Sequence, residues 1–271
     1  MKIGSREFDP KHHTYICGIL NVTPDSFSDG GKYKGLDEAL YRTEEMLDEG
    51  MDILDIGGES TRPGHVSISA EEEMERVLPV LEGIKERFSV PISLDTWKYE
   101  VAKEGIRTGA DMINDIWGLR RDERMAGLLA GTQVACCLMH NRREAVYGDF
   151  IEEVKMDFQE ILSKAREAGI NEERIILDPG VGFGKDYRQN LLVINHLEEF
   201  VQLGFPLLLG VSRKSVIGMT LGVEPSERLA GSLATGIVGI VKGCGFLRVH
   251  DVKAHVHAVK MVEAIREVEE R

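Results

Sequence analysis

The sequence predicts an α/β fold, a single-domain (β/α)8 TIM barrel with a short N-terminal extension. Short apolar runs recur eight times along the 271 residues, and helix-like stretches lie between them. No Pro/Ser-rich linker and no change of composition divides the chain. A chain of this length commonly forms one such barrel, whereas the alternative, a doubly wound open sheet, more often has about five to seven strands.

The predicted strands are short and are separated by enough chain for a crossover helix. In order, they are Tyr15–Leu20, Asp52–Ile56, Pro91–Leu94, Asp111–Asn114, Val134–Met139, Arg174–Leu177, Pro206–Val211 and Phe246–Val249. We expect residues 1–14 to form a small N-terminal extension at the bottom of the barrel. Residues 15–271 would then form the barrel domain.

Apolar residues recur at helical spacing after the first two predicted strands. The first set is Leu36, Ala39, Leu40, Thr43, Met46 and Leu47, and the second is Met74, Val77, Leu78, Leu81, Ile84 and Phe88. Ser69 and Glu72 have the spacing of a capping box directly before the second helix.

The charge balance argues against some classes of partner. The 33 basic and 46 acidic residues give 33 − 46 = −13, and the pI is about 5.2. This argues against binding to nucleic acid or to an anionic membrane. No signal-peptide pattern follows Met1, no 18-residue apolar run occurs, and none of the four cysteines belongs to a CxxC pair. We therefore expect a cytoplasmic protein with buried thiols and no disulfides.

Polar residues follow every predicted strand. They are Asn21 and Thr23, Gly57 to Ser60, Asp95 and Thr96, Asn114 and Asp115, His140 and Asn141, Asp178, Ser212 and Lys214, and His250 and Asp251. Capping of the next helix is an equally good explanation for any one of them. Their presence after all eight strands favours a site at the carboxyl-terminal rim of the barrel, where such enzymes place their catalytic groups.

Two long segments, Asn21–Gly35 and Gly57–Ser69, lack apolar periodicity, and we interpret them as lids over this rim. Asp95, Asn114 and Asp178 are suited to bind the polar edge of a flat heterocycle. Arg248 and His250 lie two residues apart and so face one side of a strand. With Asn21 and the cations of the Ser212–Ser215 segment, they could bind a di- or polyphosphate.

Other kinds of site have weaker support. His12 and His13 are adjacent and are expected at the surface, and His255 and His257 are expected to face solvent on the last helix. No zinc signature and no GxSxG sequence is present. Cys136 and Cys137 lie within a predicted strand, which favours core packing over a nucleophilic role.

Taken in order, the strand exits resemble the dihydropteroate synthase family. The resemblance rests on GILNVTPDSFSDGG, DIGGESTRPG, SLDTWK, INDIWG, LMH, DPGVGFGK, GVSRKS and RVHDV, and it extends from about Cys17 to Val252. It implies a (β/α)8 barrel, Mg²⁺ and a homodimer. It also implies a reaction of folate biosynthesis, in which 6-hydroxymethyl-7,8-dihydropterin diphosphate condenses with 4-aminobenzoate to give 7,8-dihydropteroate and pyrophosphate.

The resemblance also implies roles for individual residues. Asp95, Lys214 and Arg248 would be catalytic, and the pterin would bind to Asp95, Asn114, Asp178, Lys214 and Arg248. Asn21, Arg248 and His250 would bind the diphosphate, with Asn21 also reaching the metal. The 4-aminobenzoate pocket would comprise Phe27, Thr61, Arg62, Pro63, Phe183, Ser212 and Lys214. Closure of the lids over a bound pterin would make 4-aminobenzoate the second substrate to bind.

Two stretches depart from the usual pattern of the family. After LMH the chain continues with residues 141–144 (NRRE), where relatives more often have Met, Gly and Pro. Trp97 and Trp117 stand where smaller or different residues are common. These departures bear on the contacts of the fifth loop and on the edges of the pocket.

Two alternatives remain open at this point. A pterin-binding methyltransferase that acts on a corrinoid protein would share the Asp, Asn and Asp set, but it should lack the NVTPDSFSDGG, STRPG and SRKS segments. A non-catalytic pterin-binding paralogue should have lost lid or phosphate residues. This chain keeps Asn21, Arg62, Lys214, Arg248 and His250.

Overall fold

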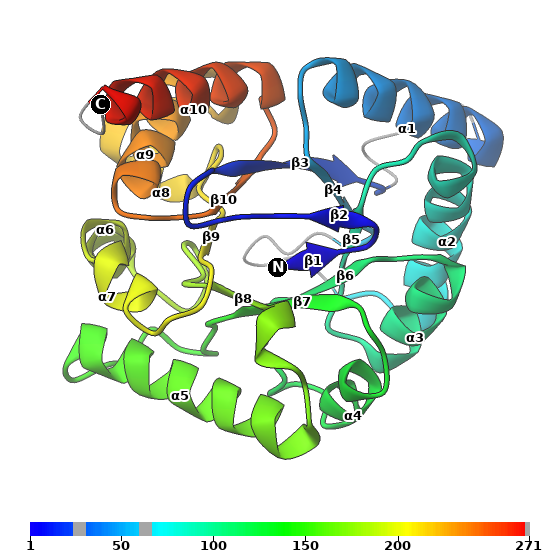
Figure 1. The fold of residues 1–271 in the computed structure, drawn as a ribbon, viewed down its shortest axis with the longest axis horizontal. Helices are drawn as coiled ribbons and strands as arrows, with labels where there is room; N and C mark the ends of the chain where they lie inside the picture. Colours follow the sequence, from blue (N-terminus) through cyan, green and yellow to red (C-terminus); the bar gives the residue numbers. More distant parts are fainter. Residues whose placement is uncertain (24–30, 60–66, 269–271) are drawn as a thin grey trace.

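The computed structural model describes residues 1–23, 31–59 and 67–268, and for residues 31–34 it describes the backbone alone. The predicted barrel is confirmed. Eight parallel strands form one sheet in the order β8-β7-β6-β5-β4-β3-β10-β9. The bridge between Leu177 and Leu207 joins β8 to the β9 segment, so the sheet closes on itself. Figure 1 looks down this barrel, with the helices arranged around it.

The observed strands overlap the predicted runs, with ends that differ by one or a few residues. They are β3 (Tyr15–Asn21), β4 (Ile53–Gly57), β5 (Ile92–Asp95), β6 (Met112–Asp115), β7 (Ala135–Met139), β8 (Ile175–Asp178), β9 (Leu208–Leu209) and β10 (Phe246–Val249). All residues of β4 to β9 are buried, because the barrel covers one face of each strand and the helices cover the other.

The helices follow the strands in alternation. They are α1 (Gly31–Asp48), α2 (Ala70–Arg87), α3 (Tyr99–Thr108), α4 (Arg124–Ala130), α5 (Phe150–Ala168), α6 (Tyr187–Asn195), α7 (Leu197–Val201), α8 (Ser215–Leu221), α9 (Leu229–Val241) and α10 (Val252–Glu267), with 3-10 turns at Glu172–Arg174 and Pro225–Glu227. Helix α1 begins at Gly31, so the predicted loop Asn21–Gly35 is too long at its end. Residues 24–30 and 60–66 of the two predicted lids lie outside the described residues, and lid closure stays a prediction.

Ser69 caps α2 as predicted, because its hydroxyl oxygen accepts the N–H of Glu72 at 3.1 Å. The other half of the expected capping box differs. The carboxylate of Glu72 pairs with Arg76, one turn further along the helix, at 2.5 Å. Arg76 in turn donates to the carbonyl of Gly58 at 2.8 Å, which connects α2 to the carboxyl end of β4.

An antiparallel hairpin, β1 (Lys2–Ile3) and β2 (Arg6–Glu7), crosses the amino-terminal end of the barrel (Figure 1). Ile3 and Phe8 are buried there among apolar side chains from the bottom of the strands. The Phe8 ring lies 4.7 Å from the ring of Tyr15 and 6.0 Å from that of Phe246. The hairpin thus supplies the apolar floor of the barrel interior.

Three predictions about isolated residue types can now be compared with the structure. His12 and His13 are exposed, as predicted, and all four cysteines are buried, whereas the sequence indicated this for three of them. The prediction for His255 is wrong: the residue is only 1% exposed. It lies on the face of α10 formed by Val252, Val256 and Val259, and its Nδ1 lies 2.8 Å from the carbonyl oxygen of Asp251. Its Nδ1 thus has a backbone partner, whereas its Nε2 is buried without one.

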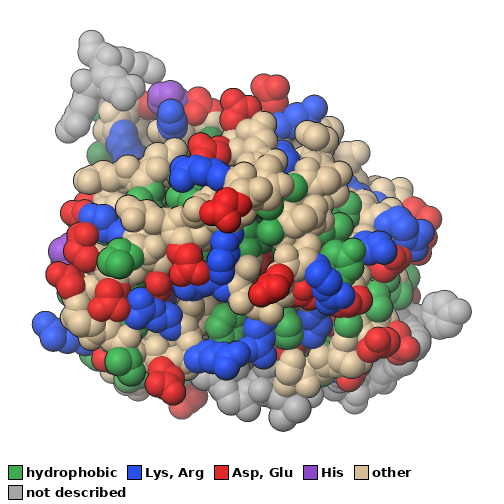
Figure 2. Space-filling view, turned by 90° about the horizontal axis from the view of Figure 1, so that it is seen from below, with side chains coloured by type: hydrophobic (Ala, Val, Ile, Leu, Met, Phe, Trp, Pro, Cys, Tyr) green, Lys and Arg blue, Asp and Glu red, His purple; other side chains and the backbone are tan. Residues whose placement is uncertain are grey.

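The excess of acidic residues does not form one continuous patch on the face seen in Figure 2, where acidic and basic side chains are interspersed. Among the helices of the described residues, none has both the length and the apolar composition that crossing a bilayer requires.

The hairpin contact leads to a prediction about stability. Phe8→Ala should lower the free energy of unfolding by about 3–5 kcal/mol, because it removes a buried ring from the barrel floor. Urea unfolding measures the change, and the exposed residue His12, substituted by Ala, is the control. A loss below about 1 kcal/mol would show that the hairpin contributes little.

Candidate active site

Three charged side chains meet inside the carboxyl-terminal end of the barrel. Arg248 on β10 donates from Nε to Asp55 Oδ2 on β4 and from a terminal nitrogen to Asp95 Oδ2 on β5, both at 2.5 Å. In the sheet order, β3 separates β10 from β4, so the arginine reaches across β3 to both carboxylates. The side chains of Asp55 and Asp95 are 3% and 5% exposed, which removes most of the screening by water.

The sequence analysis predicted Asp95 and Arg248 but missed Asp55. This aspartate lies inside the apolar run Ile53–Gly57 and follows no turn, so position at a strand end could not identify it. The available signal was an ionisable residue in an otherwise apolar strand, since buried charges are almost always paired.

The three charges change one another's protonation. Burial raises the pKa of Asp95 to about 7, with Arg248 opposing the rise and Asp55 adding to it. Burial also works against the charged guanidinium of Arg248, but Asp55 and Asp95 outweigh it and raise the pKa of this arginine. The cluster therefore keeps its cation at every physiological pH, while Asp95 changes charge near neutrality.

Two buried acceptor atoms lie near this cluster without a hydrogen-bond partner: Oδ1 of Asp95 and Oδ1 of Asn114. Their strands are neighbours and the two residues are direct partners in the register. Buried polar atoms in native proteins nearly always have partners. A pair of unsatisfied acceptors at adjacent strand ends therefore indicates a place for a ligand that carries N–H groups.

Asp178 at the end of β8 is the third predicted member of this set. Its Oδ1 accepts the N–H of Gly180 at 2.7 Å. Its Oδ2 faces β9 and β10, since a Cβ atom built on Gly210 would lie 3.8 Å from Oδ2 and 4.0 Å from Cβ of Arg248. Burial raises the pKa of the Asp178 carboxyl, and the N–H of Gly180 and the charges of Lys214 and Arg248 oppose the rise.

Two neighbouring cations in the segment after β9 have different contacts. Arg213 has the left-handed backbone angle φ 57° and makes a two-pronged ion pair with Asp251, at 3.0 and 2.6 Å. Its role is therefore structural, unlike the ligand-binding role that we expected for both cations. Lys214 has its amine 4.3 Å from the centre of the Phe183 ring, so these two predicted residues are in contact.

Ser212 and His250, which we expected in two different substrate sites, are in contact. The hydroxyl oxygen of Ser212 accepts the backbone N–H of His250 at 3.2 Å and lies 3.1 Å from its ring Nδ1. Burial, together with the nearby charge of Arg248, lowers the pKa of His250 to about 4. The ring is neutral at pH 7 in this structure, so it offers an anion a hydrogen bond instead of a charge.

The remaining predicted residues fall into two groups. Asn21 is exposed at the end of β3, opposite Gly57 in the register. A Cβ atom on Gly57 would lie 3.9 Å from Oδ1 of Asn21 and 3.8 Å from Oδ2 of Asp95, so this glycine leaves space between the two oxygens. The second group lies outside the described residues: Phe27, Thr61, Arg62 and Pro63.

Turn capping explains one residue of the exit after β6. Asp115 accepts the N–H groups of Trp117 and Leu119, at 2.9 and 2.7 Å, and so it stabilises the turn after β6. Asn114, its neighbour, points into the barrel end with Asp95. The alternation of side chains along a strand thus divides adjacent polar residues between a structural role and a site.

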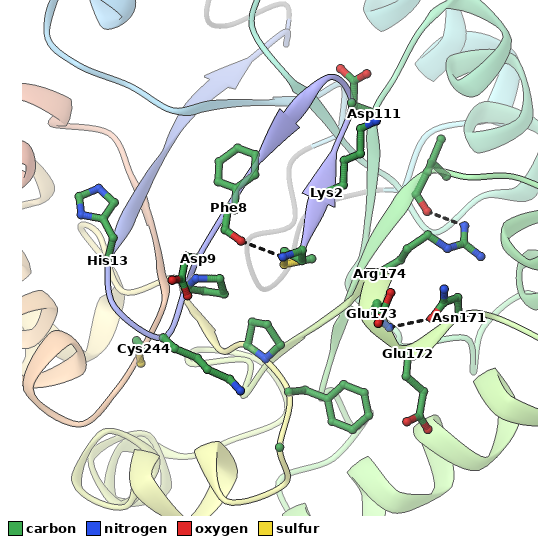
Figure 3. A pocket seen from close by; sticks show the side chains of 18 of the residues that line it. Lys2, Phe8, Asp9, His13, Asp111, Asn171, Glu172, Glu173, Arg174 and Cys244 are labelled. Carbon is green, nitrogen blue, oxygen red and sulfur yellow. Dashed lines mark hydrogen bonds between the residues drawn. The ribbon is translucent and has the colours of Figure 1, made fainter.

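A cavity of about 1490 Å³ lies at the opposite end of the barrel, beside the hairpin (Figure 3). Several of its polar groups have partners within the chain, and Nε of Arg174 is buried without one. Asp9 contacts His12 at 2.7 Å, and Arg174 donates to the carbonyls of Thr132 and Val134 at 2.7 and 3.0 Å. The unsatisfied acceptors Asp95 and Asn114 instead lie at the carboxyl-terminal end, which is where we place the candidate active site.

Comparison with known proteins agrees with this geometry. A family described as "Pterin binding enzyme" matches residues 17–250. A dihydropteroate synthase of Clostridium beijerinckii is 52% identical over 266 residues, which cover 98% of this chain and 99% of that protein. The chain belongs to the dihydropteroate synthase family.

Solved structures of dihydropteroate synthases have the same fold. The Clostridium difficile enzyme, crystallised in the presence of pteroic acid, has a TM-score of 0.93 and 48% identity, covering 96% of this chain and 99% of that one. The Xanthomonas albilineans enzyme with 4-aminobenzoic acid has a TM-score of 0.90 and 41% identity, covering 94% and 93%.

The ion pairs of Arg248 predict a pH-dependent loss of stability. Arg248→Ala should lower the free energy of unfolding by about 3–5 kcal/mol at pH 7, because two buried carboxylates lose their cation. The loss should be smaller at pH 5, because Asp95, with its pKa raised to about 7, is then mostly protonated and neutral. A carboxyl whose pKa is raised on folding binds more protons in the folded state, so its contribution to stability falls as pH rises from about 4 to 7.

Urea unfolding at both pH values measures this effect, with Arg143→Ala, at an exposed arginine, as the control. A loss of the same size at pH 5 and pH 7 would contradict the assignment of buried, titrating partners.

Proposed function

We propose that this chain condenses 6-hydroxymethyl-7,8-dihydropterin diphosphate with 4-aminobenzoate, giving 7,8-dihydropteroate and pyrophosphate. The observation that carries the proposal is the pair of unsatisfied buried acceptors, Asp95 Oδ1 and Asn114 Oδ1, close to the Arg248 guanidinium. Membership of the dihydropteroate synthase family supports the choice of substrates. The barrel of residues 15–271 is the catalytic domain, and residues 1–14 are its extension.

The pterin ring binds among the strand ends of β5, β6 and β8. Its amino and ring N–H groups donate to Asp95, Asn114 and Asp178, because carboxylate and amide oxygens are acceptors. Lys214 and Arg248 complete the set, and the planar guanidinium of Arg248 is suited to lie against a flat ring. Hydrogen bonds to the ionised form of Asp95 lower its pKa from about 7, so the bound ring favours the carboxylate.

The diphosphate lies toward Asn21, Arg248 and His250. Arg248 supplies positive charge, and His250 supplies a hydrogen bond from a neutral ring. When the bond to pyrophosphate breaks, positive charge develops on the pterinylmethyl group. The buried carboxylate of Asp95 stabilises it electrostatically. An aromatic amine then attacks as a neutral nucleophile, so no strong general base is required.

Mg²⁺ is the cofactor that family resemblance implies. Magnesium prefers oxygen ligands and usually binds one or two protein groups together with substrate phosphates and water. The exposed amide oxygen of Asn21 fits this pattern. In the part of the chain that the structure describes, no three His, Cys, Asp or Glu side chains form a metal cluster. Bound with the diphosphate, Mg²⁺ would offset the charge of the leaving group.

The 4-aminobenzoate pocket includes Phe183, Ser212 and Lys214, in which the ammonium of Lys214 pairs with the carboxylate of the substrate. The contact between Lys214 and the Phe183 ring supports this grouping. Phe27, Thr61, Arg62 and Pro63 are assigned to the same pocket from resemblance alone.

The chain acts as a cytoplasmic homodimer, and exposed apolar side chains of α8 and α9 support the dimer. Met219, Leu221, Leu229, Val238 and Val241 are large apolar side chains exposed on these two helices. Exposed apolar patches commonly mark protein interfaces. Sedimentation at micromolar concentration distinguishes the dimer from a monomer.

One assay tests the proposed function directly. Pyrophosphate should be released only when both the pterin diphosphate and 4-aminobenzoate are present, and EDTA should suppress the release until Mg²⁺ is restored. Release without 4-aminobenzoate would indicate a hydrolase, and no release with both substrates would overturn the proposal.

Asp178→Asn should weaken pterin binding by about 1.5–3 kcal/mol while leaving 4-aminobenzoate binding nearly unchanged. The substitution removes a charge-assisted acceptor and retains the shape of the side chain. Calorimetry with the pterin substrate measures the change. Asp186→Asn is the matched control, because Asp186 caps α6 and Asn caps helices equally well. Unchanged pterin affinity in a folded D178N variant would refute the role of Asp178.

A further inference from the structure

The amine of Lys185 lies at the centre of a cluster that the proposed chemistry does not use. It donates to Nδ1 of His140 at 2.8 Å and to the carbonyls of Gly180 and Phe183, both at 3.0 Å. A lysine ammonium has three N–H donors, which equals the number of acceptors here. A neutral amine has only two, so it would leave one of the three acceptors without a partner.

His140 connects Lys185 to α5. The imidazole is fully buried, and its Nε2 lies 2.8 Å from Oδ2 of Asp157. Burial, together with the charge of Lys185, lowers the pKa of His140 to about 3, so the ring is neutral. These contacts assign the proton to Nε2, which donates to Asp157, and leave Nδ1 to accept from Lys185.

Asp157 is in turn held by Arg142, in the loop that departs from the family pattern. Nε and a terminal nitrogen of Arg142 donate to the two carboxylate oxygens of Asp157, at 2.7 and 3.1 Å. Arg142 also pairs with Glu153, one helical turn earlier on α5, at 2.8 Å. The divergent residue thus fixes the orientation of the carboxylate that faces His140.

The loop that Lys185 supports connects the two proposed substrate sites, since it begins after Asp178 and contains Phe183. Its backbone lies directly against the loop after β7. A Cβ atom on Gly180 would be 2.0 Å from the carbonyl oxygen of His140, and one on Gly184 would be 2.3 Å from that of Arg142. Both glycines also have positive φ angles, so few other residues could follow this path.

We propose that Lys185, as an ammonium, is a positioning residue that fixes the 179–184 loop and thereby places Phe183 beside the pterin site. The inference rests on the proposed function, since it assigns Phe183 to 4-aminobenzoate. Lys185 touches neither substrate. It acts through the carbonyls of Gly180 and Phe183.

The surroundings of Lys185 make this positioning depend on pH. Burial lowers the pKa of Lys185 to about 7, while Asp178 and Asp157 oppose the decrease and Arg120 and Lys214 add to it. The ammonium is therefore present below pH 7 and is lost as pH rises above it. Affinity for 4-aminobenzoate should fall over the same range. The titration of Asp95 affects pterin binding in the opposite direction. Affinity for the pterin should rise with pH, because binding needs the carboxylate form of Asp95.

The first experiment compares Lys185→Met with Lys155→Met in steady-state pyrophosphate release. Lys155 lies on the surface of α5 and pairs with Glu152 and Glu199, so its loss controls for removal of a charge. K185M should raise the KM for 4-aminobenzoate about tenfold or more, and it should change the KM for the pterin diphosphate by less than about threefold. Equal KM values for 4-aminobenzoate in the two variants would overturn the inference.

The second experiment measures kcat/KM for 4-aminobenzoate against pH. Wild type should lose activity with an apparent pKa near 7, and Asp157→Asn should shift this limb to lower pH, because it removes a negative charge that favours the ammonium. Glu153→Gln is the matched control, since Glu153 contacts Arg142 but not His140. Superimposable profiles for D157N and E153Q would contradict the proposal.

A third measurement is independent of turnover. The ¹⁵N NMR signal of the Lys185 amine should titrate near pH 7 in wild type and at lower pH in D157N. If wild type does not release pyrophosphate, the proposed function fails and the NMR titration still tests the state of Lys185. If wild type is active but Lys185 titrates above pH 9, the proposed function stands, the pH dependence of the positioning fails, and the comparison of K185M with K155M still decides the positioning role.

Discussion

The structure of the candidate active site depends on one buried ion-pair cluster at the carboxyl-terminal end of the barrel, formed by Arg248, Asp55 and Asp95. Arg248 pairs with one oxygen each of Asp55 and Asp95 in a place that water barely reaches, and the charge of the cluster changes as Asp95 titrates near pH 7. Charges in such a position cost stability unless they are well paired. The cluster therefore requires a rigid surrounding barrel. Oδ1 of Asp95 is left without a partner, which is the property that suits the site to a ligand.

The amino-terminal end of the barrel contributes mainly to stability, and the carboxyl-terminal end holds the candidate active site. At the amino-terminal end, the hairpin segment fills the interior with Ile3 and Phe8, and Arg174 beside it donates to the carbonyl of Thr132. At the carboxyl-terminal end, glycines such as Gly57 and Gly210 leave space beside charged side chains. Mutations at the first end should affect folding, and mutations at the second should affect binding.

The sequence predicts much of this structure because periodicity and strand-end position are local signals. Asp95, Asn114 and Asp178 could be found because each ends an apolar run. Asp55 could not, because it lies within such a run and its partner Arg248 is distant along the chain. Nor could the different roles of Arg213 and Lys214, because a left-handed backbone at Arg213 separates two neighbouring cations. The contact of Lys185 with His140 likewise depends on two loops from different strands.

The pairing of β3 with β10 has a consequence for synthesis of the chain. The first barrel strand lies beside the last one, and the Phe8 ring packs on Phe246. Before residues 246–249 emerge from the ribosome, β3 therefore has an open edge and Phe8 lacks its contact with Phe246. Exposed strand edges and apolar surface make partly made chains prone to aggregation. The edge of β3 therefore stays open to pairing with another chain until residues 246–249 have emerged.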